Sequence, residues 1–172
     1  SVVINNRGEI SGRYRKTHLF TMSRESSYYD ESCFFNAGDS SCVVDILGHK
    51  CGLTVCFDLR FPALYAQYLK KQVDMITVPS SFTKFSGDAG HWEILLRARA
   101  IESQCFVLAP NQVGIGVMGL MTYGNSLLID PWGDVLIRGS ESEEEVLTCE
   151  VDFQRVNAVR ELIKTRQSIK DF

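Results

Sequence analysis

The chain has 172 residues, of which 45% are hydrophobic and 23% are charged, a composition typical of one soluble globular domain with enough apolar side chains for a core. It excludes a disordered segment and a small disulfide-stapled scaffold. The formal net charge of −3 offers no basic surface to nucleic acid or anionic lipid, and no apolar run approaches the roughly 20 residues of a membrane helix, so we expect neither kind of partner.

Two β-hairpins are predicted in the first third of the chain. Residues 2–4 and 9–14 flank Asn5-Asn6-Arg7-Gly8, whose Asn and Gly supply the positive φ angles of a tight turn. Residues 43–47 and 51–56 flank Gly48-His49 in the same way. Each pair of segments therefore predicts two antiparallel strands.

Strands and helices then alternate along the chain. We expect a helix over residues 62–71, with Pro62 at a tolerated early position, a strand over 75–78, a helix over 90–104, strands over 106–109, 127–130, 135–137 and 146–151, and a helix over 153–164 capped by Asp152. In the helix over 90–104 the apolar residues share one face. This order predicts α/β layers in which helices cover a sheet.

Cys56 ends an apolar run and is followed at once by the polar residues of Phe57-Asp58-Leu59-Arg60. The run predicts a buried strand, and open α/β sheets bind ligands at the carboxyl ends of their strands. A nucleophilic cysteine requires a sharp strand-to-helix turn, backbone N–H groups for an oxyanion, and nearby positive charge. Cys56 is therefore a candidate nucleophile; the alternatives are a buried structural thiol and a redox-sensitive thiol.

Lys16 lies near the end of a predicted strand. It alternates with Tyr14 in a period of two, so the two side chains are expected on one face, pointing inward; the alternative is an ordinary solvated lysine. Glu31, by its own surroundings, is typical of a loop carboxylate. Residues alone therefore favour a role for Lys16 more than for Glu31.

Cofactor and metal motifs are weak or missing. The six cysteines form no C-x-x-C pair and no zinc-type spacing with histidine, which favours a reduced protein in the cytoplasm and no metal. Gly114-Ile115-Gly116-Val117-Met118-Gly119 matches G-x-G-x-x-G, but a strand is predicted after it where a dinucleotide site requires a helix. We expect these glycines to form a loop at a pocket rim, and no cofactor.

Five segments, taken in order, resemble one known family over nearly the whole chain: YRKTHLF, CGLTVCFDLRFPALY, PSSF, HWEILLRARAIESQCFVLAPNQVG and YGNSLLIDPWG. They are similar to the nitrilase superfamily of carbon–nitrogen hydrolases, and most similar to its branch of deaminated glutathione amidases and omega-amidases. The resemblance implies an αββα sandwich, with residues 1–172 as one domain that corresponds to the C-terminal part of the fold.

The resemblance also implies a Glu-Lys-Cys catalytic centre. Cys56 matches the nucleophile that forms a thioester with an amide substrate, and Lys16 matches the lysine that stabilises the oxyanion together with the backbone N–H of Phe57. Glu31 resembles the second, assisting glutamate of the family. The family's general-base glutamate lies well before the lysine motif, whereas only fifteen residues precede Lys16 here. We therefore expect the base and the first strands and helices of the sandwich to be absent, with apolar residues left facing solvent.

Four further residues are implied in substrate binding: Phe57, Phe82, Arg60 and Glu93, of which Arg60 and Glu93 could instead form a structural ion pair. The expected function is hydrolysis of carbon–nitrogen bonds in small linear amides by a homo-oligomer. The alternative, based on the missing base, is a catalytically inactive remnant that acts as an oligomerisation or binding module.

Overall fold

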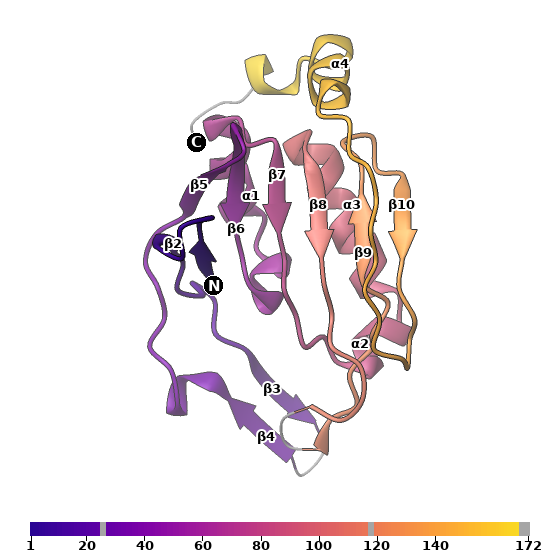
Figure 1. Ribbon diagram of the computed structural model, residues 1–172. Coiled ribbons are helices and arrows are strands. Elements are labelled where there is room, and N and C mark those ends of the chain that lie inside the picture. The colour runs from indigo at the N-terminus through magenta and orange to yellow at the C-terminus, as the bar shows by residue number, and fades with distance from the viewer. Residues whose placement is uncertain (25–26, 117–118, 169–172) are drawn as a thin grey trace.

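The computed structural model describes residues 1–24, 27–116 and 119–168. Within them, six strands form one mixed sheet in the order β10-β9-β8-β7-β6-β5 (Figure 1). The strands are β5 (Cys42–Ile46), β6 (His49–Leu53), β7 (Met75–Thr77), β8 (Phe106–Ala109), β9 (Leu127–Ile129) and β10 (Val135–Arg138). The central strands β6, β7 and β8 run parallel, and the outer pairings are antiparallel.

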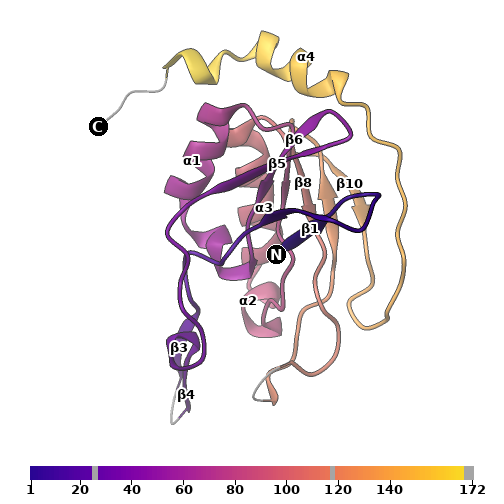
Figure 2. The same cartoon turned by 60° about the vertical axis from the view of Figure 1, so that its left-hand side comes forward.

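Helices cover one face of this sheet (Figure 2). α1 (Pro62–Lys71) and α3 (His91–Ser103) pack against each other, and α2 (Lys84–Asp88) precedes α3. The main core fills the space between sheet and helices, with Tyr65, Ile76, Trp92, Leu96 and Val107 all fully buried. These side chains recur with the periodicity of a strand or a helix. Burial of one apolar face of each element therefore explains why the helices pack on the sheet.

The opposite face of the sheet is covered only in part. The predicted first hairpin, β1 (Val2–Ile4) and β2 (Ile10–Arg13), lies over β5 and encloses a second, smaller core of Tyr14, Val44, Cys51 and Leu53. Over the middle of the sheet no helix or strand of the described residues is packed, and Leu108 is 41% exposed. Apolar side chains therefore face solvent there, as the sequence predicts.

The remaining elements lie at the two ends of the sheet (Figure 1). Near the carboxyl ends of the parallel strands lie the unpredicted hairpin β3 (Thr21–Arg24) and β4 (Ser27–Asp30) and the short helix η1 (Glu31–Cys33). At the other end lie α4 (Gln154–Leu162) and η4 (Thr165–Ser168). The Asp152 carboxylate accepts the backbone N–H of Gln154 at 2.9 Å, but α4 begins at Gln154 with Phe153 as its N-cap residue, one position later than predicted.

Three predicted strand features differ from the structure. The strand expected over residues 51–56 is β6 (His49–Leu53), which ends before Cys56. The turn of the second hairpin is Leu47-Gly48, one residue earlier than expected, and both residues have positive φ angles. The predicted strand over residues 146–151 is wrong, because this segment has no ladder hydrogen bonds. It borders the cavity over the open face of the sheet, and no strand of the described residues pairs with it.

The described residues contain neither a cluster suited to a metal ion nor a helix suited to a membrane. No three His, Cys, Asp or Glu side chains come close enough together there to hold a metal ion. Nor does any helix in those ranges combine the length and apolarity needed to cross a membrane.

Candidate active site

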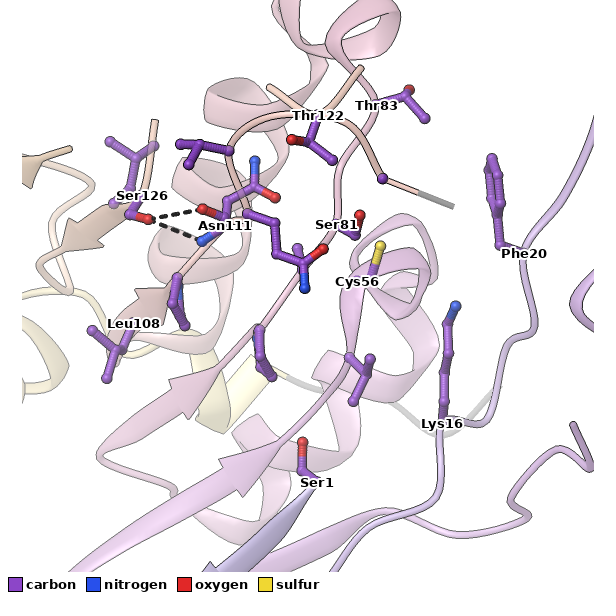
Figure 3. Close-up of a pocket in the computed structure, with 18 of the residues that line it drawn as sticks. Ser1, Lys16, Phe20, Cys56, Ser81, Thr83, Leu108, Asn111, Thr122 and Ser126 are labelled. Carbon is purple, nitrogen blue, oxygen red and sulfur yellow. Dashed lines mark hydrogen bonds between the residues drawn. The ribbon is translucent and has the colours of Figure 1, made fainter. Parts of the chain in front are cut away.

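The carboxyl ends of β6, β7 and β8 bring three polar positions together. Beyond the strands the backbone continues the ladder: the N–H of Cys56 donates to the carbonyl of Pro79 at 3.0 Å, and the N–H of Ser80 donates to that of Pro110 at 2.9 Å. Ser80 in turn forms a bridge with Asn111. Cys56, Ser80 and Asn111 therefore lie side by side at the predicted end of the sheet, where Figure 3 shows Cys56 and Asn111.

Cys56 stands at a sharp strand-to-helix turn. Val55 is extended, with φ −141°, and Cys56 then adopts a left-handed φ of 48° as the first residue of the short helix η2 (Cys56–Arg60). A side chain with a Cβ rarely adopts this conformation, and such strain is concentrated at functional sites. The same backbone device presents the nucleophile in strand–nucleophile–helix elbows, so the local geometry is that of a nucleophile turn.

Lys16 and Glu31 form an ion pair beside this turn. The Glu31 carboxylate also accepts the backbone N–H of Phe20 at 2.7 Å, and the Lys16 Nζ lies 6.0 Å from the centre of the Phe57 ring. In Figure 3 the Lys16 ammonium and the Cys56 thiol point into the same space. The structure thus brings together the three residues for which the resemblance implied catalytic roles.

The expected strand geometry around Lys16 is wrong. β2 ends at Arg13, so Tyr14 and Lys16 do not share the face of a strand. Tyr14 instead directs its hydroxyl to the Asp58 carboxylate at 2.8 Å, while the Lys16 carbonyl accepts the N–H of Gly38 at 2.8 Å. Tertiary contacts, not strand alternation, aim the lysine at the cavity.

A cavity of about 1400 Å³ opens above these groups. Lys16, Glu31 and Cys56 line one part of it, together with the polar side chains of Ser80, Ser81, Asn111, Gln112 and Thr122. The Asn111 side chain is itself fixed, because its Oδ1 accepts the N–H of Phe82 at 2.8 Å and its Nδ2 donates to the carbonyl of Gly124 at 2.6 Å. The result is a polar pocket at the edge of an apolar sheet face.

Opposing effects act on the Cys56 thiol. Burial raises its pKa, and the charge of Glu31 adds to this, whereas the Lys16 charge and hydrogen bonds from the Ser81 backbone and the Ser80 side chain lower it. Burial is the largest of these effects, so the net pKa lies above that of a free cysteine. A thiol of this kind needs a base to remove its proton during attack.

Phe57, Phe82 and Arg60 line a second, small cavity next to Cys56. The Arg60 guanidinium lies over the Phe82 ring, 5.3 Å from its centre, and its Nη1 is 3.4 Å from Nδ1 of His91. Among the described residues it has no carboxylate partner. Arg60 therefore presents a cationic group close to the thiol.

Glu93 lies elsewhere. Its carboxylate contacts Arg138 at 2.5 Å and Arg97 at 3.5 Å, and it lines neither cavity. The ion pair with Arg60 considered from the sequence is not formed, because the turn of α3 directs His91 towards Arg60 and Glu93 towards β10. The Arg138 and Arg97 charges hold the pKa of Glu93 below its usual value, as expected for a structural ion pair.

Sequence reasoning missed Asp58 and Asn111. Asp58 is completely buried, and its carboxylate accepts hydrogen bonds from two segments of the chain. The signal available in the sequence was a carboxylate placed between Phe57 and Leu59 just after a buried strand, since a buried charge requires partners.

Of the glycine motif, Val117 and Met118 lie outside the described residues, and Gly116 lines the large cavity.

The family model described as carbon-nitrogen hydrolase matches residues 1–161. The chain belongs to the carbon–nitrogen hydrolase family. A deaminated glutathione amidase of Yersinia enterocolitica is 41% identical over 138 residues, which cover 79% of this chain and 48% of the relative. The chain thus spans about half the length of the curated relatives it matches.

Solved structures agree with this assignment of a carbon–nitrogen hydrolase fold. The NitFhit protein of C. elegans superposes with a TM-score of 0.88 at 35% identity, covering 98% of this chain and 41% of that one. A mutant amidase from Nesterenkonia sp. AN1, which carries a covalent acetamide moiety at its active-site cysteine, has a TM-score of 0.70 at 26% identity, covering 82% and 50%. The nitrilase-type fold expected from the sequence is confirmed.

Proposed function

We propose that this chain provides the nucleophile and the oxyanion-binding lysine of an amidase that hydrolyses small linear amides. One observation carries the proposal: Cys56, on a left-handed strand-to-helix turn, shares a cavity with a lysine that Glu31 holds in place. Relatives named deaminated glutathione amidase, at 41% identity and below, support this chemistry for the whole protein.

In the proposed reaction the Cys56 sulfur attacks the amide carbonyl carbon while a base takes the thiol proton. The carbonyl oxygen becomes an oxyanion that accepts hydrogen bonds from the Lys16 Nζ and from the backbone N–H of Phe57, which stands in the first turn of η2 where N–H groups lack helical partners. Collapse breaks the C–N bond, and the base returns its proton to the leaving amine. Water then hydrolyses the thioester, which regenerates the thiol and releases an acid.

Glu31 is assigned to holding Lys16, since its carboxylate is occupied by the lysine and by the Phe20 N–H. The general base is placed in the part of the relatives that this chain does not span, where the resemblance puts a glutamate. The same part would supply the second half of the αββα sandwich. Homo-oligomer formation stays a prediction.

Arg60 points to substrates that carry a carboxylate. Its guanidinium is close to Cys56, is partly buried, and lacks an acidic partner in the described chain, so a substrate carboxylate would complete a charge-assisted pair. Phe57 and Phe82 form apolar walls beside it. We therefore propose ω-amides of dicarboxylic or 2-oxo acids, deaminated glutathione among them, as the substrate class.

The test is amide turnover by the whole gene product. We expect release of amine or ammonia from deaminated glutathione and from 2-oxo acid ω-amides, with a thioester-linked acyl group trapped on Cys56 by acid quenching and mass spectrometry. Cys56→Ala should abolish both signals, whereas Cys33→Ala, which replaces an exposed cysteine that lines neither cavity, should retain turnover.

Two results would contradict the proposal. Turnover that survives Cys56→Ala would exclude the thioester mechanism. A whole protein without amide turnover, in which Cys56 oxidises rapidly, would favour a redox thiol, and one with neither property would favour a binding module.

A further inference from the structure

Asp58 is a buried carboxylate to which none of the proposed chemical steps assigns a role. It lies two residues after Cys56, in the same short helix, and is completely inaccessible to solvent. Burying a carboxylate is costly unless it is hydrogen-bonded on all sides. The identity of its partners therefore indicates what the charge is for.

The partners of Asp58 come from two separate segments. From its own turn, the backbone N–H of Val55 donates to Oδ2 at 3.0 Å. From the segment that carries Lys16, the Tyr14 hydroxyl donates to Oδ2 at 2.8 Å, and the Thr17 hydroxyl and the His18 backbone N–H donate to Oδ1 at 3.0 Å each. The carboxylate thus joins the residues on both sides of Lys16 to the turn that carries Cys56.

The His18 ring strengthens this connection. Its Nδ1 lies 2.9 Å from Asp58 Oδ1, and the ring stacks on Phe61 at a centroid distance of 3.7 Å, just after η2 ends. β2 ends at Arg13, and Tyr14 still exchanges backbone hydrogen bonds with Ser1 at 2.9 and 2.8 Å, but among the described residues no strand pairs with residues 15–18. Their position depends on Asp58, on the bond between the Lys16 carbonyl and the Gly38 N–H, and on the ion pair with Glu31.

We propose that Asp58 is a positioning residue that sets the location of the Lys16 ammonium relative to the Cys56 thiol. This inference rests on the proposed roles of Cys56 and Lys16. Asp58 acts through other groups: its oxygens are enclosed by protein donors and line neither cavity. Hydrogen bonds to a charged acceptor are shorter and stronger than neutral ones, which suits a connection that must hold one charge at a defined distance.

A displaced lysine would change the ionisation of Cys56. The charged groups that act on this thiol are Lys16, Glu31 and Arg60. The Lys16 charge lowers the thiol pKa, whereas Glu31 and burial raise it. If Lys16 moves away, less thiolate is present at a given pH, and the pH midpoint of thiol alkylation rises.

The experiment measures iodoacetamide alkylation of Cys56 against pH in the 172-residue chain and in the whole gene product. Fragmentation of the peptide that contains both Cys51 and Cys56 separates the two sites. Asp58→Asn and Lys16→Met should each raise the midpoint by about one pH unit, the lower range for loss of a close opposite charge. In the Lys16→Met background, Asp58→Asn should produce no further shift, because the group through which it acts is gone.

Asp130→Asn is the matched control. Asp130 is also buried and also holds a turn, accepting the N–H groups of Trp132 and Asp134 and a bond from Arg155. It should lower stability without moving the Cys56 midpoint. If Asp58→Asn does not fold, Tyr14→Phe combined with Thr17→Val removes two donors, leaves the carboxylate, and should raise the midpoint by a smaller amount.

The outcomes separate the two proposals. A Lys16→Met chain with an unshifted midpoint would overturn the proposed role of Lys16 itself. Two results would overturn the positioning role alone. In the first, Lys16→Met shifts the alkylation midpoint but folded Asp58→Asn does not. In the second, Asp58→Asn shifts the midpoint equally in the unmodified chain and in the Lys16→Met background. In the whole protein, Asp58→Asn should reduce kcat about tenfold and leave KM unchanged. This result supports the positioning role, since the oxyanion contact acts in the transition state.

Discussion

At the scale of single residues, the site balances burial against charge. Burial raises the pKa of the Cys56 thiol, and the Lys16 charge partly offsets this effect. Arg60 adds a second cation, and burial lowers its pKa, which reflects the cost of burying a guanidinium that has no acidic partner among the described residues. A substrate carboxylate would remove that cost. We therefore assign substrate specificity to Arg60 and oxyanion stabilisation to Lys16.

Arg60→Gln tests this division. We expect KM to rise about tenfold for amides that carry a carboxylate, since a hydrogen-bonded charge pair contributes roughly 1.5–3 kcal/mol, while kcat changes little. Steady-state kinetics of the whole gene product provide the measurement, and a neutral aliphatic amide is the matched control. An equal loss for charged and neutral amides would show that Arg60 supports the fold of the turn instead.

At the scale of elements, β6 is placed by close contact with α1. Gly52 faces Tyr68, where an added Cβ would meet ring carbons at 2.8–3.0 Å. The Tyr68 ring is fully buried and its hydroxyl donates to the Leu53 carbonyl at 2.5 Å, so it cannot move aside freely. Since β6 leads directly into the Cys56 turn, this contact also helps to fix the position of Cys56.

Gly52→Ala should therefore destabilise the chain by about 1–3 kcal/mol, the usual cost of overpacking. Urea unfolding followed by circular dichroism measures the change. Gly48→Asn in the same hairpin is the control, because Gly48 has a positive φ that Asn tolerates and no atom within 4 Å of an added Cβ. Equal stability of the Gly52→Ala and unmodified chains would show that α1 shifts without cost.

At the scale of the whole molecule, the sheet has one covered face and one largely open face (Figure 2). Leu108 lies on the open side with Met75, Leu128 and Ile137, which all line the large cavity. Leu108 is 41% exposed, Met75 and Ile137 are half-buried, and Leu128 is buried; apolar side chains grouped around an exposed one are typical of a surface that another part of a protein covers. In the αββα sandwich of the family, such a face belongs to the interior.

Leu108→Glu should reduce the fluorescence of an apolar dye bound to the 172-residue chain by half or more, because a charge in the middle of the patch interrupts it. Ile94→Glu is the control: Ile94 is 66% exposed on α3, on the covered side of the molecule, and its replacement should leave the signal nearly unchanged. An equal reduction in both variants would place the dye elsewhere.

Local patterns in the sequence predict much of this structure. The helix over 62–71, the strand over 106–109 and the hairpin formed by residues 2–4 and 9–14 agree closely with α1, β8 and the β1–β2 pair. Apolar runs, Pro62 and turn glycines are properties of neighbouring residues, so they can be recognised without the fold. The short elements β3, β4 and α2 lack such signals, and were missed.

By itself, the sequence determined that a buried strand leads to a break in the chain at Cys56, because burial and the break are encoded within a few residues; it placed Cys56 inside the strand, which ends at Leu53. Only the tertiary structure decided that Glu93 pairs with Arg138, that residues 146–151 form no strand, and that Asp58 connects the lysine segment to the nucleophile turn. These outcomes depend on which distant segments meet, with Asp58 and Thr17 separated by 41 positions. Contacts at that range are set by packing, which no local pattern specifies.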